Sequence, residues 1–142
     1  MVNDLIDGIS VKLNQVFGVG YRIYSENVQQ GLKEPCFFIA ILNPSQTQII
    51  GNRYFRQHPF DIHYFPVKQG NNKEIQDVAY KLLDALEYIP LLNGELVRGT
   101  EMHYEQVDDV LHFFVQYNMY VNKVIVPADD MQTIKVNNKV KG

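Results

Sequence analysis

The sequence predicts an α+β fold: a two-layer sandwich in which two helices pack on one face of a mostly antiparallel sheet. Two segments repeat apolar residues at helical spacing, and the segments around them alternate or run apolar as strands do. The last third of the chain has the pattern of one long hairpin. The expected order of elements is α-β-β-β-α-β-β. With both helices on one side, the far face of the sheet is uncovered.

Length and composition indicate one globular domain. The chain has 142 residues, of which 46% are hydrophobic and 20% charged, so it can bury a stable core without disulfides or metal ions. We predict a single domain over residues 1–126 and a polar C-terminal tail at 127–142. The role of the tail stays open, and one alternative is a flexible arm that becomes ordered on assembly.

Charge and apolar runs exclude several classes of partner. A net charge of −3 without a dense basic stripe argues against specific nucleic-acid binding. The longest apolar run, residues 37–42, is too short to cross a bilayer, so no membrane partner is expected. The single Cys36 opens this run and is expected to be a buried thiol. No signal-peptide pattern is seen, and we expect a protein made and kept in a cytoplasm.

The first half of the chain begins with a helix and continues in strands. Asn3 or Asp4 is expected to cap the helix, and Gly18 to end it. Its apolar positions are Leu5, Ile6, Ile9, Leu13, Val16 and Phe17. A weakly alternating strand is expected at 21–28, at an edge, and a buried strand at 37–42. A turn at 43–45 then starts a return strand at 46–50.

Residues 53–65 predict a long aromatic strand that contains Pro59. Because proline cannot donate to a sheet ladder, the strand is expected to be an edge there or to carry a bulge. A bulge would exchange the two faces of the strand midway. Phe55 and Ile62 would then both point inward.

The second half combines the strongest helical pattern with a hairpin. A helix is expected at 73–89, capped by Asn71 or Asn72 and stopped by Pro90. The hairpin strands are expected at 92–106 and 110–124, joined by a turn at Asp108-Asp109. A further short strand is compatible with the spacing of the apolar residues after 133, although Asn137-Asn138 can turn it. These apolar residues are Ile134, Val136 and Val140.

Residues 111–121 alternate without a break. Every second residue, from Leu111 to Val121, is apolar and is assigned to the core. The opposite side carries amides together with the aromatic residues Phe114 and Tyr120. Aromatic side chains on a polar face are typical of a surface that contacts another protein.

Two groups of residues have the chemistry of metal ligands. Asp61 and His63 share one side of a strand, and a two-residue turn at 108–109 would bring His103, Glu105 and His112 together. The alternative is that all are polar residues paired across strands on an outer sheet face. We favour this alternative, because no constrained ligand motif is present, and we predict no metal site.

No pattern indicates catalysis or a cofactor. A nucleophile elbow of the form GxSxG is not found. A buried Cys36 would have a raised pKa and would be a poor nucleophile. We therefore predict that the protein is not an enzyme and that it has no catalytic or cofactor-binding residues.

Three blocks of the sequence resemble the phage tail terminator family of Gram-positive phages and defective prophages. They are residues 26–42 (ENVQQGLKEPCFFIAIL), residues 51–66 (GNRYFRQHPFDIHYFP) and residues 97–121, which contain RGT at 98–100 and DDVLHFFV at 108–115. With the flanking helices, the resemblance covers most of residues 3–122.

The resemblance implies a structural role. Members of this family have an α+β sandwich fold and no catalytic residues to carry over. They form a ring, usually a hexamer, that stops polymerisation of the tail tube and presents a surface to the head. The implied partners are further copies of the chain, the tail tube protein and the head-tail connector protein. The implied place is the virion tail or neck, assembled in the cytoplasm of the bacterial host.

A ring requires that one patch of each subunit meets a different patch of its neighbour. The residues expected on the assembly surface are Arg53, Phe55, His58, His63, His103, Glu105, His112, Phe114, Gln116 and Tyr120. The alternative within the same virus is another neck component, either a head-tail connector or a tail completion protein. A small metal-binding domain is the alternative from a different class.

Overall fold

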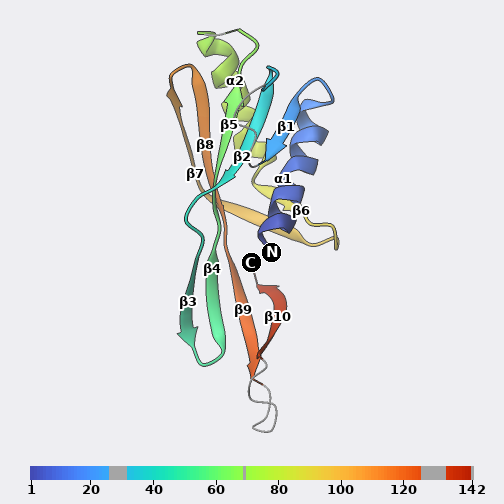
Figure 1. The fold of residues 1–142 in the computed structure, drawn as a ribbon, viewed down its shortest axis with the longest axis vertical. Helices are drawn as coiled ribbons and strands as arrows, with labels where there is room; N and C mark the ends of the chain where they lie inside the picture. The colour runs from blue at the N-terminus through green and yellow to red at the C-terminus, as the bar shows by residue number, and fades with distance from the viewer. Residues whose placement is uncertain (26–31, 69, 126–133, 142) are drawn as a thin grey trace.

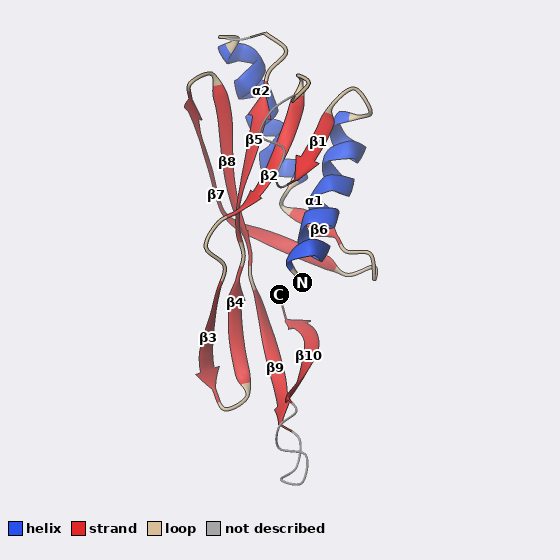
Figure 2. Ribbon diagram, viewed as in Figure 1, coloured by secondary structure: helices blue, strands red, loops and turns tan. Residues whose placement is uncertain are grey.

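The computed structural model describes residues 1–25, 32–68, 70–125 and 134–141, and it confirms the predicted α+β class. Figure 1 shows both helices against the upper sheet, while a second sheet extends below them. The same division is visible by element type in Figure 2. No helix in the described part of the chain is long and apolar enough to cross a membrane.

Helix α1 (Val2–Phe17) begins earlier than predicted and ends as predicted. Asn3 and Asp4 are not its N-cap but lie inside the first turn, where the Asp4 carboxylate interacts favourably with the helix dipole. At the other end Gly18 follows the last helical residue with φ of 85°, a conformation that glycine adopts without strain.

Helix α2 (Asn72–Ala85) is capped by Asn71, one of the two predicted caps. The Asn71 side-chain oxygen accepts a hydrogen bond from the Glu74 backbone N–H at 3.2 Å. The predicted end at residue 89 is wrong, because residues 88–90 are a strand paired with residues 96–98. The carbonyl of Leu86 instead accepts the Tyr117 hydroxyl at 2.7 Å, so tertiary contacts, and not Pro90, end the helix.

The described strands form two sheets. The upper sheet has the order β1-β2-β5-β8-β7-β6, and the lower sheet has the order β10-β9-β4-β3. Neighbours are antiparallel except β1 and β2, which are parallel. The strands are β1 (Arg22–Ser25), β2 (Cys36–Ile41), β3 (Ser45–Ile50), β4 (Arg53–Gln57), β5 (Pro59–Phe65), β6 (Tyr88–Pro90), β7 (Leu96–Val107), β8 (Val110–Tyr117), β9 (Met119–Ile125) and β10 (Ile134–Lys141).

The edge position predicted for the first strand is confirmed, since β1 lies at one end of the upper sheet. Residues 26–28 of that prediction lie outside the described residues. The predicted turn at Asp108-Asp109 is also confirmed. Both aspartates have positive φ, 50° and 62°, as a two-residue hairpin loop requires.

One antiparallel ribbon passes through both sheets and joins them. Its first strand is β4 followed by β5, and its second is β8 followed by β9. Pro59 pairs with Gln116 above the junction, and Arg56 pairs with Met119 below it. The two pairs lie three positions apart on each strand. The register is therefore unchanged where the chain passes from one sheet to the other.

Side chains complete the ribbon at this junction. The Tyr117 backbone N–H donates to the His58 carbonyl at 3.0 Å, as in a regular ladder. The His58 backbone N–H donates instead to Asn118 Oδ1 at 3.1 Å, and the His58 ring donates from Nδ1 to the Tyr117 carbonyl at 2.9 Å. Two side chains thus replace the reciprocal backbone bond.

Pro59 is neither at a sheet edge nor on a bulged strand, so both predicted alternatives are wrong. It lies between β2 and β8, and its carbonyl accepts the Leu42 N–H at 2.8 Å. Because proline has no N–H, it cannot return this bond, and the pairing with β2 ends there. The irregularity lies on the partner strand, where the register changes by one residue between β2 and β3.

Two consequences correct further expectations. Residues 43–45 do not reverse the chain: β3 continues onward from β2, and the reversal comes at Gly51, whose φ is 54°. The two faces of the ribbon do not exchange at Pro59. Ile62 is buried in the core, whereas Phe55 lies on the opposite side with its ring 4.9 Å from that of Tyr120.

The core lies between the helices and one face of the upper sheet, and it extends onto the first residues of β9. It contains the alternate residues from Leu111 to Val121, all at most 1% exposed, which confirms the predicted alternation. The apolar residues noted after residue 133 lie in strand β10, which pairs with β9. The division into one domain and a polar tail stays a prediction.

Helix α1 approaches β6 closely through Gly8. A Cβ placed on Gly8 would lie 2.7 Å from the Pro90 carbonyl oxygen and 3.3 Å from Ile89 Cδ1. In an exposed helix, alanine is more stable than glycine by about 1 kcal/mol. Here the added methyl group meets backbone, so overpacking outweighs the helical preference.

We expect Gly8→Ala to lower the free energy of unfolding by about 1–3 kcal/mol, measured by urea unfolding followed by circular dichroism. Gly20→Ala is the matched control, because no atom lies within 4 Å of the position that an added Cβ would take and its backbone is not left-handed. It should change stability by less than about 0.5 kcal/mol. A Gly8→Ala protein that is more stable than wild type would contradict the close contact of α1 with β6.

Candidate functional site

The sheet face opposite the helices is lined by polar and aromatic side chains. On β8 and β9 the residues between the buried ones are half-buried, from His112 to Tyr120. We call this side of the ribbon and of its neighbouring strands the outer face. Phe38 of β2, Asp61 and His63 of β5 also belong to it through their pairing.

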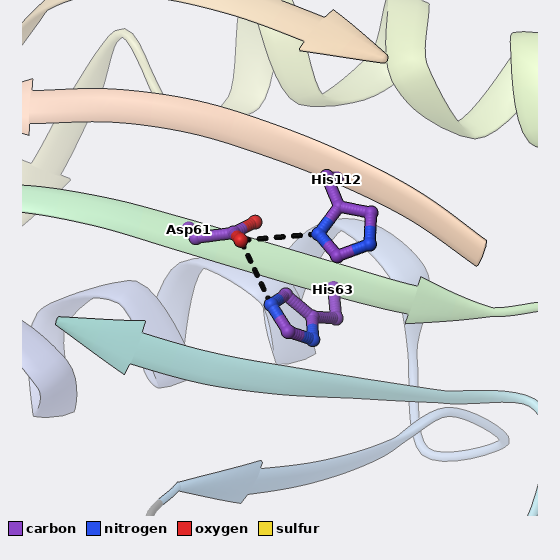
Figure 3. Close-up of side chains that lie close together, drawn as sticks. All are labelled: Asp61, His63 and His112. Atoms are coloured by element: carbon purple, nitrogen blue, oxygen red, sulfur yellow. Dashed lines mark hydrogen bonds and ion pairs between the residues drawn. The ribbon is translucent and has the colours of Figure 1, made fainter. Parts of the chain in front are cut away.

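Asp61, His63 and His112 form a cluster on the outer face (Figure 3). His63 on β5 lies directly opposite His112 on β8, and Asp61 precedes His63 by two residues on the same side. Both histidines donate to one carboxylate oxygen, Asp61 Oδ2: His63 from Nε2 at 2.9 Å and His112 from Nδ1 at 3.0 Å. The two imidazole ring centres are 4.4 Å apart.

Asp61 is the most buried member of this cluster. Its side chain is 10% exposed, against 24% for His63 and 22% for His112. Burial by itself raises the pKa of the Asp61 carboxyl, but the hydrogen bonds and charges of the two histidines outweigh it and hold that pKa below its usual range. The carboxylate is therefore ionised in the folded protein near neutral pH.

The second oxygen of this carboxylate is unpaired. Asp61 Oδ1 is buried and has no hydrogen-bond partner among the described residues. Leaving a buried polar atom unpaired costs about 1–3 kcal/mol. The cluster therefore has a buried acceptor that its two histidines do not satisfy.

Aromatic rings surround the cluster and extend it toward β7. The His63 ring is 5.7 Å from the Phe38 ring and 6.4 Å from the Phe65 ring, measured between centres. On the other side His103 stacks on Phe114 at 4.6 Å. The cluster thus lies within a larger group of aromatic rings on the outer face.

The lower part of the outer face has a second aromatic group. The Arg53 guanidinium lies over the Tyr120 ring at 4.5 Å, and Tyr120 contacts Phe55. A cation over an aromatic face at this distance is attractive. Polar-aromatic surface thus continues from the upper sheet into the lower one.

The structure brings together nine of the ten side chains that the sequence placed on the assembly surface. Nine lie on the outer face: Arg53, Phe55, His63, His103, Glu105, His112, Phe114, Gln116 and Tyr120. His58 lies on the inner face and is 4% exposed, so it is not part of the outer face.

The grouping of the candidate ligands differs from both predicted sets. Glu105 does lie opposite His112, as the two-residue turn implied, and His103 lies opposite Phe114. The hydrogen bonds of His112, however, connect it to Asp61 and not to His103 or Glu105. The hydrogen bond between His112 and Asp61 follows from the pairing of β5 with β8. The sequence carries no local signal for this strand pairing.

The helical side of the molecule carries a hollow beside the two helices. A hollow of about 320 Å³ lies between the end of α1 and α2, lined by Phe17, Tyr21, Asn71, Lys73, Glu74, Asp77, Val78 and Lys81. Its one glutamate is occupied by the Tyr64 hydroxyl and the Val67 N–H. Cys36 is buried, as predicted, and burial with a smaller effect of Glu34 raises its pKa to about 11.

Burial of His58 predicts a pH dependence of stability. Burial lowers the pKa of the His58 ring, and the hydrogen bond to the Tyr117 carbonyl opposes this only in part. Since the folded-state pKa lies below the unfolded value of about 6.5, the unfolded chain takes up the proton first. The stability from His58 is present above pH 6.5 and is lost as the pH falls through the folded-state pKa.

We expect wild type and His58→Gln to differ in the slope of unfolding free energy against pH between pH 5 and 8. The variant is less stable at pH 8, because it loses the hydrogen bond of the His58 ring. As the pH falls, it does not lose the stability that wild type loses when His58 is protonated in the unfolded chain. Urea unfolding at matched ionic strength measures both curves. Parallel curves would show that His58 titrates equally in both states.

Comparison with known proteins gives the family of the chain. A family model described as "Phage tail terminator protein" matches residues 4–129, which include most of α1, all of α2 and every strand from β1 to β9. No curated protein matches the chain significantly. Because the family model covers most of the chain, the protein belongs to the phage tail terminator family and is a structural component of a phage tail.

Proposed function

We propose that the protein forms a ring on the head-proximal end of the tail tube, ends tube polymerisation there and prepares the tail for joining to the head. Membership of the tail terminator family supports a role at the tail. The observation that carries the proposal further is the outer face, which is half-buried, aromatic and continuous over both sheets. Such a face is typical of a surface that contacts another protein.

The first patch of the ring interface is the outer face itself. It consists of the nine side chains from Arg53 to Tyr120 named above, with Phe114 and Tyr120 as its aromatic centres. Aromatic residues and arginine contribute most of the binding free energy in many protein interfaces. Its occupant in this proposal is a second copy of the chain.

The second patch is the β3 edge of the lower sheet, and this sheet extends beyond the helices (Figure 1). All six residues of its edge strand β3 are exposed, and Ile49 and Ile50 at its end are 52% and 74% exposed. An exposed edge strand readily pairs with another chain. Contact of this arm with the outer face of a neighbour is heterologous, as a ring requires.

The remaining partners follow from the place of the ring. One surface of it contacts the tail tube protein and the other the head-tail connector protein, in a hexamer assembled in the host cytoplasm and retained at the virion neck. DNA must pass through the lumen without strong binding. A chain with net charge −3 meets this requirement.

The direct test combines the purified protein with polymerising tail tube protein. We expect tubes that stop growing, each with one ring at one end, visible by negative-stain electron microscopy. Tubes without added protein should be longer and uncapped. If the protein binds heads but leaves the tube length unchanged, it is a connector instead. A protein that stays monomeric at all concentrations, also with tube protein present, would contradict the ring.

Substitution of the aromatic centres tests the interface. The double variant Phe114→Ser, Tyr120→Ser should need a protein concentration at least tenfold higher to form rings, measured by light scattering. Its folded structure should be retained. Tyr80→Ser is the matched control, because Tyr80 on α2 is 65% exposed on the helical side. Unfolding of the double variant would show that the outer face is core, and unchanged assembly would place the interface elsewhere.

A further inference from the structure

Three side chains with metal-ligand chemistry converge at one point of the outer face (Figure 3). The ligand atoms are His63 Nε2, His112 Nδ1 and a carboxylate oxygen of Asp61, and all lie within 4.8 Å of one another. They come from two paired strands in the middle of the upper sheet. Their spacing is therefore fixed by the backbone ladder and not by a loop.

The state of Asp61 is a second, independent observation. Its side chain is nine-tenths buried and directed at the two imidazoles, yet Oδ1 has no hydrogen-bond partner among the residues described. Buried carboxylates are normally satisfied by hydrogen bonds, an ion pair or a metal ion. A bound cation would neutralise the carboxylate and offer coordination to either oxygen.

The observed spacing is close to that of a metal site. Bonds from zinc to imidazole nitrogen and carboxylate oxygen are about 2.0–2.2 Å, which places tetrahedral ligand atoms roughly 3.4 Å apart. The two imidazole nitrogens are 2.9 and 3.0 Å from Asp61 Oδ2. The two spacings to Asp61 Oδ2 therefore need to widen by about 0.4–0.5 Å, and the third, between the two imidazole nitrogens, is at most 4.8 Å.

Against the expectation from the sequence, we propose that Asp61, His63 and His112 bind one divalent transition-metal ion of the zinc class. Two imidazoles with one carboxylate select such an ion over magnesium or calcium, which prefer oxygen ligands. On binding, each imidazole presents a lone pair at the nitrogen that now donates to Asp61, and its proton moves to the other ring nitrogen. Glu105 is the residue of β7 that pairs with His112 across the strands.

The two imidazoles of the proposed site are accessible from the outer face. Both imidazoles are about one-quarter exposed, whereas Phe38, Phe65 and Phe114 flank the cluster within the sheet. With three protein ligands, a water molecule would complete a tetrahedral site in the isolated protein. The site is complete within one copy of the chain, so the proposal does not rest on ring formation.

Metal titration of the full, tag-free chain after chelator treatment tests the proposal. Calorimetry with Zn²⁺ should give one site per chain, and Co²⁺ should give the visible absorption of a tetrahedral nitrogen-oxygen site. His63→Gln and His112→Gln should each weaken Zn²⁺ binding at least tenfold. His103→Gln is the matched control, because His103 lies on the same face but contacts none of the three ligands, and it should bind as wild type does.

A second measurement does not depend on the variants folding. In the NMR spectrum of wild-type protein, Zn²⁺ should shift the imidazole resonances of His63 and His112 and leave those of His58 and His103 in place. Mg²⁺ at the same concentration should shift none of them. Absence of stoichiometric Zn²⁺ binding, or binding that shifts His58 or His103 instead, would overturn the proposal.

Discussion

The unbroken register of one ribbon determines the architecture of this protein. Residues 53–64 pair with residues 111–122 through the junction between the sheets without gaining or losing a residue. The junction is where backbone pairing is weakest, since Pro59 offers no N–H to β2 and the His58 N–H leaves the ladder. Asn118 Oδ1 accepts the His58 N–H and the His58 ring donates to the Tyr117 carbonyl, so these two backbone groups keep a partner where the ribbon passes between the sheets.

Constant register keeps each face of the ribbon constant as well. Side chains alternate with a period of two, and a single inserted residue would have exchanged inside and outside below the junction. Instead the inner face carries the buried residues Phe60, Ile62 and Tyr64. The outer face remains polar and aromatic from His63 down to Arg53. A continuous outer face is what allows one surface to extend over both sheets.

Local patterns in the sequence were sufficient for several parts of this structure. The apolar stripes predicted both helices, Asn71 was among the expected caps, and the alternation at 111–121 matched burial residue by residue. Other features failed where a distant contact overrode the local signal. Pro90 did not end α2, because the carbonyls after Ala85 bond to β7 and β8, and Pro59 did not mark an edge, because its missing donor faces the end of β2.

The sequence by itself determined which residues share a face, because alternation and helical spacing depend only on backbone geometry within each segment. It thereby identified the outer face, apart from His58, and the family resemblance that the comparison then confirmed. Only the tertiary structure decided which strands are neighbours. Asp61 and His112 are 51 residues apart in the chain, and their hydrogen bond exists because β5 pairs with β8. This long-range pairing depends on the packing of the whole core and not on any local pattern.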